Sequence, residues 1–94
     1  MEDDEFEWHD AKAAGTAQRR GIDFESARAV FGDPFAIDVE DRSQVYEEQR
    51  FIRIGMVDNR LLVAVYTLRG DRTRIISVRK AMPYERRRYE NENS

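Results

Sequence analysis

The chain has 94 residues, a mass of 11.1 kDa and a formal net charge of -3, which suffices for one small domain and excludes a second core. Hydrophobic residues make up 40% and charged residues 37%, so collagen-like and fully disordered classes are excluded. The sequence holds no cysteine and a single histidine, which excludes a disulfide framework, a thiol nucleophile and a zinc ribbon.

Hydrophobic runs in the sequence are short, and the longest covers residues 61–66. A membrane-spanning helix needs about 20 apolar residues, so we expect no contact with a membrane. The chain opens with acidic residues, unlike a secretory signal, and the expected location is the cytoplasm. The sequence contains no nucleotide-binding motif and no metal-binding motif, so neither a metal nor another cofactor is expected.

The charges are divided along the chain. Residues 1–49 carry fourteen acidic and five basic side chains, whereas residues 50–88 carry eleven basic and three acidic ones. Fourteen of the sixteen cations are arginine, whose planar guanidinium group suits phosphate and carboxylate partners. Such a basic half is what an RNA-binding face needs, and the alternative is that the two halves pair with each other across one domain.

The N-terminal segment predicts a short strand. Residues 1–5 form an acidic lead-in that we expect to fray. After them, Phe6, Glu7 and Trp8 alternate between apolar and polar side chains, as a half-buried strand does. Trp8 is expected to lie in the core.

Two helices are predicted to follow this strand. The first covers residues 10–20, is rich in alanine, has a small packing face and begins at a cap formed by His9 or Asp10. Asp23 caps the second helix, over residues 24–31, where apolar side chains recur at helical spacing.

After the second helix the period changes to that of strands. Residues 35–39 alternate between apolar and polar side chains, and the polar residues 41–48 predict a loop. Two stretches rich in β-branched and aromatic residues then predict a hairpin, with residues 58–60 as its turn, and a third strand follows another tight turn. These three strands are predicted over residues 51–57, 61–68 and 74–79.

A closing helix completes the predicted fold. Pro83 suits the first turn of that helix, and residues 90–94 are expected to fray. The chain then consists of two N-terminal helices, an antiparallel β-meander and a C-terminal helix, which is a single α+β domain over residues 1–94.

Four arginines on three successive predicted strands are candidates for phosphate binding: Arg50, Arg69, Arg74 and Arg79. RNA is cleaved without a metal when the 2′-hydroxyl attacks its own phosphate, and arginines then stabilise the charge on the phosphorane oxygens. Arg74 and Arg79 are five residues apart, so they share one face of the strand only where a bulge intervenes. For each arginine, the alternative is a solvated or salt-bridged side chain.

Several short motifs occur in an order that is typical of one known family. They are Phe6-Glu7-Trp8, Lys12, Gly21 with Phe24, Val30-Phe31 with Asp33-Pro34, Glu48-x-Arg50, Ile54-Gly55, Thr67-x-Arg69, Arg74-Ile75-Ile76-Ser77-x-Arg79 and Glu85-Arg86 with Tyr89. On these motifs the chain resembles the BrnT toxin family over residues 6–89, with residues 74–79 as the most specific part.

The resemblance to BrnT toxins implies a fold, an activity and a partner. The fold is RelE-like, and the activity is that of a type II toxin that cleaves RNA without a metal and thereby inhibits translation. The partner is a BrnA-type antitoxin, which binds the toxin and represses their shared operon. Contact with operator DNA is therefore expected only through the antitoxin complex.

One segment departs from the family pattern. Members usually carry Asn-x-x-Lys-His-Gly at the end of the first helix, where this chain has Thr16, Arg19, Arg20 and Gly21. Arg20 stays protonated where histidine titrates near neutral pH, so Arg20 is a candidate catalytic cation and not an acid/base group. Two alternatives follow: a binding module that keeps antitoxin binding and operon regulation without cleavage, and an RNA-binding protein with no toxin role.

Five cations are the predicted catalytic residues: Lys12, Arg20, Arg50, Arg69 and Arg79. Lys12 matches the family's cation on the first helix and is expected to stabilise a phosphate or the leaving oxygen. Glu48 lies two residues before Arg50 and is expected to orient it through an ion pair, with a role as general base as the alternative.

Further RNA contacts are predicted from Thr67, Arg74, Arg86 and Tyr89. A tyrosine on the closing helix hydrogen-bonds a phosphate or stacks on a base, as in the recognition of single strands. The alternative for Tyr89 is that it anchors this helix to the sheet.

Overall fold

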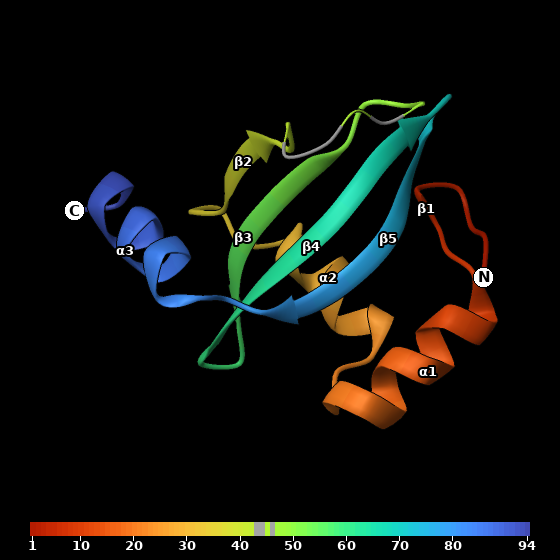
Figure 1. Ribbon diagram of the computed structural model, residues 1–94, viewed down its shortest axis with the longest axis horizontal. Helices are drawn as coiled ribbons and strands as arrows, with labels where there is room; N and C mark the ends of the chain where they lie inside the picture. Colours follow the sequence, from red (N-terminus) through yellow and green to blue (C-terminus); the bar gives the residue numbers. More distant parts are fainter. Residues whose placement is uncertain (43–44, 46) are drawn as a thin grey trace.

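The computed structural model describes residues 1–42, 45 and 47–94 (Figure 1). The elements, in chain order, are β1 (Phe6–Glu7), α1 (Asp10–Arg20), α2 (Phe24–Val30), β2 (Ile37–Glu40), β3 (Phe51–Val57), β4 (Arg60–Arg69), β5 (Arg72–Lys80) and α3 (Pro83–Glu92). The predicted α+β class and the predicted positions of the helices are confirmed. Within the described part of the chain, no helix has the length and apolarity that crossing a membrane requires.

The strands form one mixed sheet in the order β1-β5-β4-β3-β2. From β2 to β5 it is the antiparallel meander that the sequence predicts. β1 adds to β5 in parallel, which the sequence does not predict, and it places Glu7 opposite Arg74. The turn between β3 and β4 consists of Asp58 and Asn59 alone, at φ angles of 49° and 65° that these residue types tolerate, so Arg60 belongs to β4.

A β-bulge in β5 decides which side chains share a face of the sheet. The register of β5 against β4 shifts by one residue, which leaves Ile76 without a partner across the ladder. Ile75 and Val78, although three residues apart, therefore both point into the core. Their neighbours Arg74 and Arg79 both point to the opposite face. The bulge is thus the reason why two arginines five residues apart lie on the same face of the sheet.

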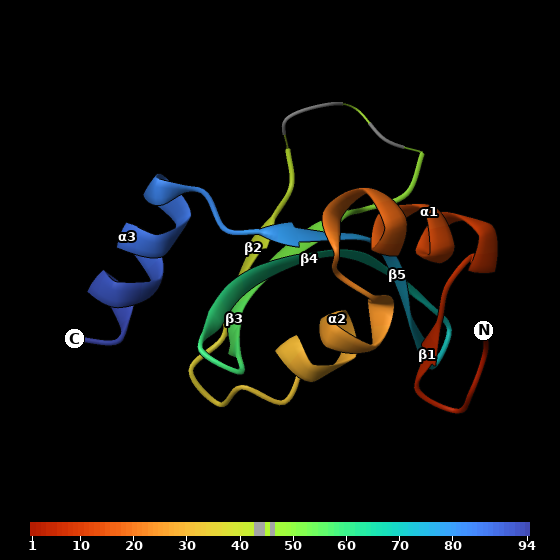
Figure 2. The same ribbon diagram turned by 90° about the horizontal axis from the view of Figure 1, so that it is seen from below.

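The main core lies between α2 and one face of the sheet, and Figure 2 shows α2 against that face. Its fully or nearly buried members include Trp8, Ile22, Phe24, Ala27, Val30, Leu62, Ile75 and Val78. Trp8 lies in this core as predicted, with its ring edge-on to Phe24 at a centroid distance of 5.8 Å. On the other face a smaller cluster of Ile54, Leu61 and Val63 packs with Tyr89 of α3.

α1 lies beside β5, and α3 lies at the opposite end of the sheet (Figure 1). His9 caps it, and its Nδ1 accepts a hydrogen bond from the backbone N–H of Lys12 at 3.3 Å. Gly21 ends it in the left-handed conformation, at φ 66°. The alanines at positions 11, 14 and 17 are exposed, and Thr16 is the buried residue of the helix.

Lys12, Thr16 and Arg20 follow one another at intervals of four residues, so they lie on one face of α1. Thr16 is 2% exposed, which shows that this face is turned toward the protein. The helix therefore brings Lys12 and Arg20 next to β5.

Hydrogen bonds hold both ends of the chain, where fraying is expected from the sequence. The Asp3 carboxylate accepts from the backbone N–H groups of Glu5 and Phe6 at 2.9 and 2.7 Å. α3 continues to Glu92, and the Asn93 side chain donates to the Phe35 carbonyl oxygen at 3.0 Å. Asp3 also has an ion pair with Arg28 of α2 at 2.8 Å, so the N-terminal segment is connected to α2 and to the sheet, and the C-terminal segment to the residues before β2.

Candidate functional site

Lys12 lies near enough to three other cations that the sequence singles out for their charges to act on it: Arg20, Arg50 and Arg74. Lys12 and Arg20 come from α1, Arg50 directly precedes β3, and Arg74 lies on β5. Partial burial lowers the pKa of the Lys12 ammonium group, and the positive charges of the three arginines lower it further. We call these four residues the cationic cluster.

Contacts with the sheet hold two members of the cationic cluster. Arg20 donates from Nη1 to the Val78 carbonyl oxygen at 2.9 Å. Arg74 lies 3.4 Å from the Glu7 carboxylate, and the two side chains are only 26% and 16% exposed. Glu7 is absent from the residues predicted for the site, although the alternation of Phe6, Glu7 and Trp8 places it on the face opposite the core.

A hollow beside the cationic cluster is lined by Glu48, Arg50 and Arg69, among others. Glu48, predicted to orient Arg50, has an ion pair with Arg69 at 3.4 Å. Thr67, predicted to contact RNA, is 2% exposed, and its hydroxyl donates to the Gln49 carbonyl oxygen at 2.6 Å. Thr67 thus supports the backbone next to Arg50 from beneath the surface.

Arg79 has a carboxylate partner on α3. Its Nη1 and Nη2 donate to Oε1 and Oε2 of Glu85 at 2.7 and 2.9 Å. Glu85 is 3% exposed and also accepts from the Met82 backbone N–H at 2.8 Å. Burial opposes the ionisation of Glu85, but the hydrogen bonds from Arg79 and Met82 outweigh it and lower the pKa of Glu85. The guanidinium group of Arg79 therefore fixes the start of α3.

A comparison with protein families matches residues 8–85 to the family described as "Ribonuclease toxin, BrnT, of type II toxin-antitoxin system". The chain belongs to this family. The match includes all four members of the cationic cluster and confirms the resemblance found in the sequence. The family implies RNA as the substrate and an antitoxin as the partner. None of the curated proteins compared with the chain matches it.

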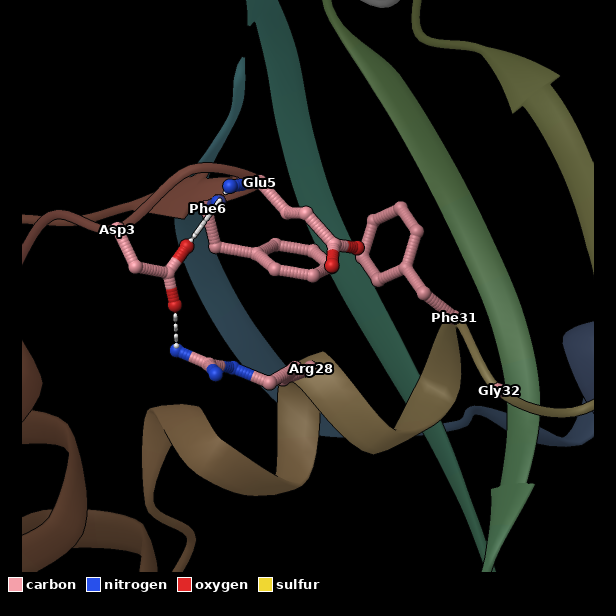
Figure 3. Close-up of a pocket in the computed structure, with 6 residues that line it drawn as sticks. All are labelled: Asp3, Glu5, Phe6, Arg28, Phe31 and Gly32. Carbon is pink, nitrogen blue, oxygen red and sulfur yellow. Dashed lines mark hydrogen bonds and ion pairs between the residues drawn. The ribbon is translucent and has the colours of Figure 1, made fainter.

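A second hollow of this BrnT family member lies on the α2 side of the sheet, between β1 and α2 (Figure 3). Phe6 and Phe31 form its apolar wall, with ring centroids 5.2 Å apart. Its cation, Arg28, is paired with Asp3 at 2.8 Å and with Glu25 at 3.4 Å. Because Arg28 is neutralised, this hollow offers little attraction for a phosphate.

Among the described residues, no group of three or more His, Asp or Glu side chains is arranged to hold a metal.

Tyr89 of this toxin family member lies on α3, where its hydroxyl donates to Oδ2 of Asp33 at 2.7 Å. Burial and this hydrogen bond raise the pKa of Tyr89 to about 12. Asp33 also accepts from the backbone N–H groups of Met56 and Phe35, at 2.8 and 2.9 Å. This geometry favours the anchoring role for Tyr89 that the sequence leaves open.

Replacing Tyr89 with phenylalanine is expected to lower the free energy of unfolding by about 1 kcal/mol, because Asp33 loses one donor. The rate of RNA cleavage is expected to stay unchanged. Urea unfolding and a cleavage assay on the same preparations check both expectations. Slower cleavage at unchanged stability would assign Tyr89 to RNA binding instead.

Proposed function

We propose that the chain is a RelE-like, metal-independent endoribonuclease and that the cationic cluster is its catalytic site. The observation that supports this proposal is that the face of α1 turned toward β5 carries Lys12 and Arg20, with Arg50 and Arg74 near enough to act on the charge of Lys12. The chain is also a member of a family of ribonuclease toxins. In the proposed reaction the 2′-hydroxyl of a ribose gives its proton to water and attacks the adjacent phosphate. The bond to the 5′-oxygen breaks, which leaves a 2′,3′-cyclic phosphate and a 5′-hydroxyl end.

The residues of the cluster have different roles in this reaction. Arg50 and Arg74 stabilise the negative charge on the phosphorane oxygens, for which a guanidinium group offers two parallel donors. Lys12 donates a proton to the leaving 5′-oxygen, and its lowered pKa eases the release of that proton. Arg20, near Lys12, and Arg69, in the hollow with Arg50, add positive charge for the RNA backbone.

A BrnA-type antitoxin is the proposed partner of the chain. It neutralises the toxin by covering the cationic cluster, because this surface attracts an acidic protein segment as well as RNA. The complex represses the shared operon, and operator DNA is contacted through the antitoxin. The free toxin inhibits translation by cleaving RNA in the cytoplasm.

The test is incubation of the purified chain with labelled total RNA in EDTA, beside the variants Arg50→Ala and Arg88→Ala. We expect cleavage by the native chain and a rate about a hundredfold lower for Arg50→Ala, since one charge-stabilising donor is lost. Arg88→Ala is the matched control, because Arg88 lies on α3 and pairs with Glu92 at 3.3 Å. We expect it to cleave at the native rate.

A folded native chain that leaves RNA intact would contradict this function and favour the binding module without cleavage. The observation in favour of that second candidate is the departure at Thr16 and Arg20, both on the face of α1 that carries Lys12. In that case a variant with Thr16→Asn and Arg20→His is tested for RNA cleavage. If this variant cleaves RNA, the substitutions at positions 16 and 20 are the reason why the native chain does not.

A further inference from the structure

The arginines of the basic half differ in whether they have a carboxylate partner. Arg69, Arg72, Arg74 and Arg79 each form an ion pair. In contrast, Arg60, Lys80 and Arg86 are exposed and have no ion pair with any described residue. Three of these four ion pairs join the two halves of the chain, and the pair of Arg79 with Glu85 lies within the basic half. No described carboxylate pairs with Arg60, Lys80 or Arg86, so their charges are open to a ligand.

These three cations lie around one hollow of about 240 Å³, together with Asn59, Leu61 and Ala81. They come from three parts of the chain, because Arg60 follows the β3–β4 turn, Lys80 ends β5 and Arg86 lies in α3. The backbone N–H of Ala81 donates to the Leu61 carbonyl oxygen at 2.9 Å, which holds the end of β5 against β4. We call Arg60, Lys80 and Arg86 the hairpin cations.

The hairpin cations are connected to the cationic cluster along β5. Lys80 also lines a neighbouring hollow with Arg20, Ile22 and Arg79, and Arg20 is a member of the cationic cluster. From Arg74 to Lys80, the six steps of strand cover about 20 Å. Arg20, Arg79 and Lys80 line one hollow on the part of β5 that β1 leaves unpaired, so positive side chains occur along this edge of the sheet over a length that an extended polyanion can span.

We propose that the hairpin cations bind a phosphate of the RNA strand several nucleotides away from the cleaved one. This inference rests on the proposed function and specifies its substrate as a single-stranded RNA that follows β5. Cationic side chains in a row bind a single-stranded backbone without reading its bases. The three cations come from different elements but line the same hollow, so one phosphate can contact all of them. Cations scattered over a surface lack such a shared hollow.

The binding test uses an RNA oligonucleotide with 2′-O-methyl groups, which the chain cannot cleave, and measures fluorescence anisotropy at several salt concentrations. Arg60→Ala and Lys80→Ala are each expected to reduce the slope of log K against log salt by about 0.7, the contribution of one single-strand phosphate contact. Arg87→Ala is the matched control, because Arg87 is an exposed neighbour of Arg86 outside the hollow. Its slope is expected to equal that of the native chain.

Cleavage assays separate this binding site from the catalytic site. On a dinucleotide, which occupies the cleavage site alone, Arg60→Ala and Lys80→Ala are expected to match the native chain. On a long oligonucleotide the same variants are expected to raise KM several-fold at unchanged kcat.

Two results would overturn the proposed phosphate site. Slopes that stay unchanged in Arg60→Ala and Lys80→Ala would mean that these cations serve a protein surface. Slopes that fall equally in Arg87→Ala would mean that they act only through net charge. Failure of the native chain to cleave either substrate contradicts the proposed function, and the anisotropy comparison still decides the binding site.

Discussion

Replacing Lys12 with alanine is expected to slow RNA cleavage by about two to four orders of magnitude, which is the contribution of a positioned proton donor. Lys12 is the only lysine of the cationic cluster, and arginine serves in proteins as a fixed charge and not as a proton donor. Lys12→Arg keeps the positive charge but supplies no titrating group, so we expect it to remain nearly as slow as Lys12→Ala. Single-turnover rates on labelled RNA measure both variants.

The pH dependence of cleavage tests the same role of Lys12. A proton donor must be protonated, so the rate falls as the pH rises through the pKa of Lys12. Burial and the neighbouring arginines lower that pKa, so the fall begins below the ordinary range of a lysine. Arg74→Gln removes one of these charges and is expected to raise the pKa of Lys12, which moves the fall to higher pH.

Two outcomes would contradict the assignment of Lys12. One is native-like cleavage by Lys12→Arg, which would show that charge alone suffices. The other is a fall in rate at the same pH in the native chain and in Arg74→Gln. Thermal unfolding of each variant controls for stability, and we expect little change because the Lys12 ammonium group forms no ion pair with a described residue that the substitution would remove.

Replacing Arg79 with alanine is expected to lower the free energy of unfolding by about 3 kcal/mol. The physical reason is that Glu85, which is 3% exposed, would lose the partner of its buried charge. The value lies at the lower end for a buried ion pair because the Arg79 side chain is 26% exposed. Urea unfolding at neutral pH measures this loss.

The stability difference between native chain and Arg79→Ala is also expected to depend on pH. Glu85 has a lower pKa in the folded chain than in the unfolded one, so its contribution is complete above the unfolded pKa. It is lost as the pH falls through the folded pKa. The difference is therefore largest at neutral pH and shrinks in acid, and a difference that stays constant into acid would contradict the ion pair as its source.

Loss of cleavage in Arg79→Ala alone does not identify a catalytic residue, because the variant is destabilised. A variant with Arg79→Met and Glu85→Leu is expected to regain much of the lost stability, since an apolar pair replaces the buried ion pair. We expect this folded variant to cleave RNA, in keeping with a positioning role for Arg79. A folded variant that fails to cleave RNA would support the catalytic role predicted from the sequence.

Interactions between near neighbours along the chain are the part of this protein that its sequence determines by itself. His9 and Asp23 cap helices that begin next to them, and residues 58 and 59 form a tight turn that their side chains tolerate. The alternation of apolar and polar residues predicts the strands of the meander, because this pattern too lies between near neighbours. Residue type and family motifs also single out all four members of the cationic cluster.

Contacts between distant parts of the chain decide the rest. The parallel pairing of β1 with β5 joins Glu7 to Arg74, 67 residues later, and no local pattern encodes such a partner. The bulge at Ile76 is a feature of the pairing between β5 and β4, and it turns Arg74 and Arg79 to one face.

The tertiary structure also decides which cations have a carboxylate partner. Arg79 has a buried carboxylate beside it, whereas Arg60 and Lys80 have no acidic partner among the described residues, and composition treats the three alike. Whether a cation has a carboxylate beside it depends on which segments the sheet brings together, and local sequence does not specify that.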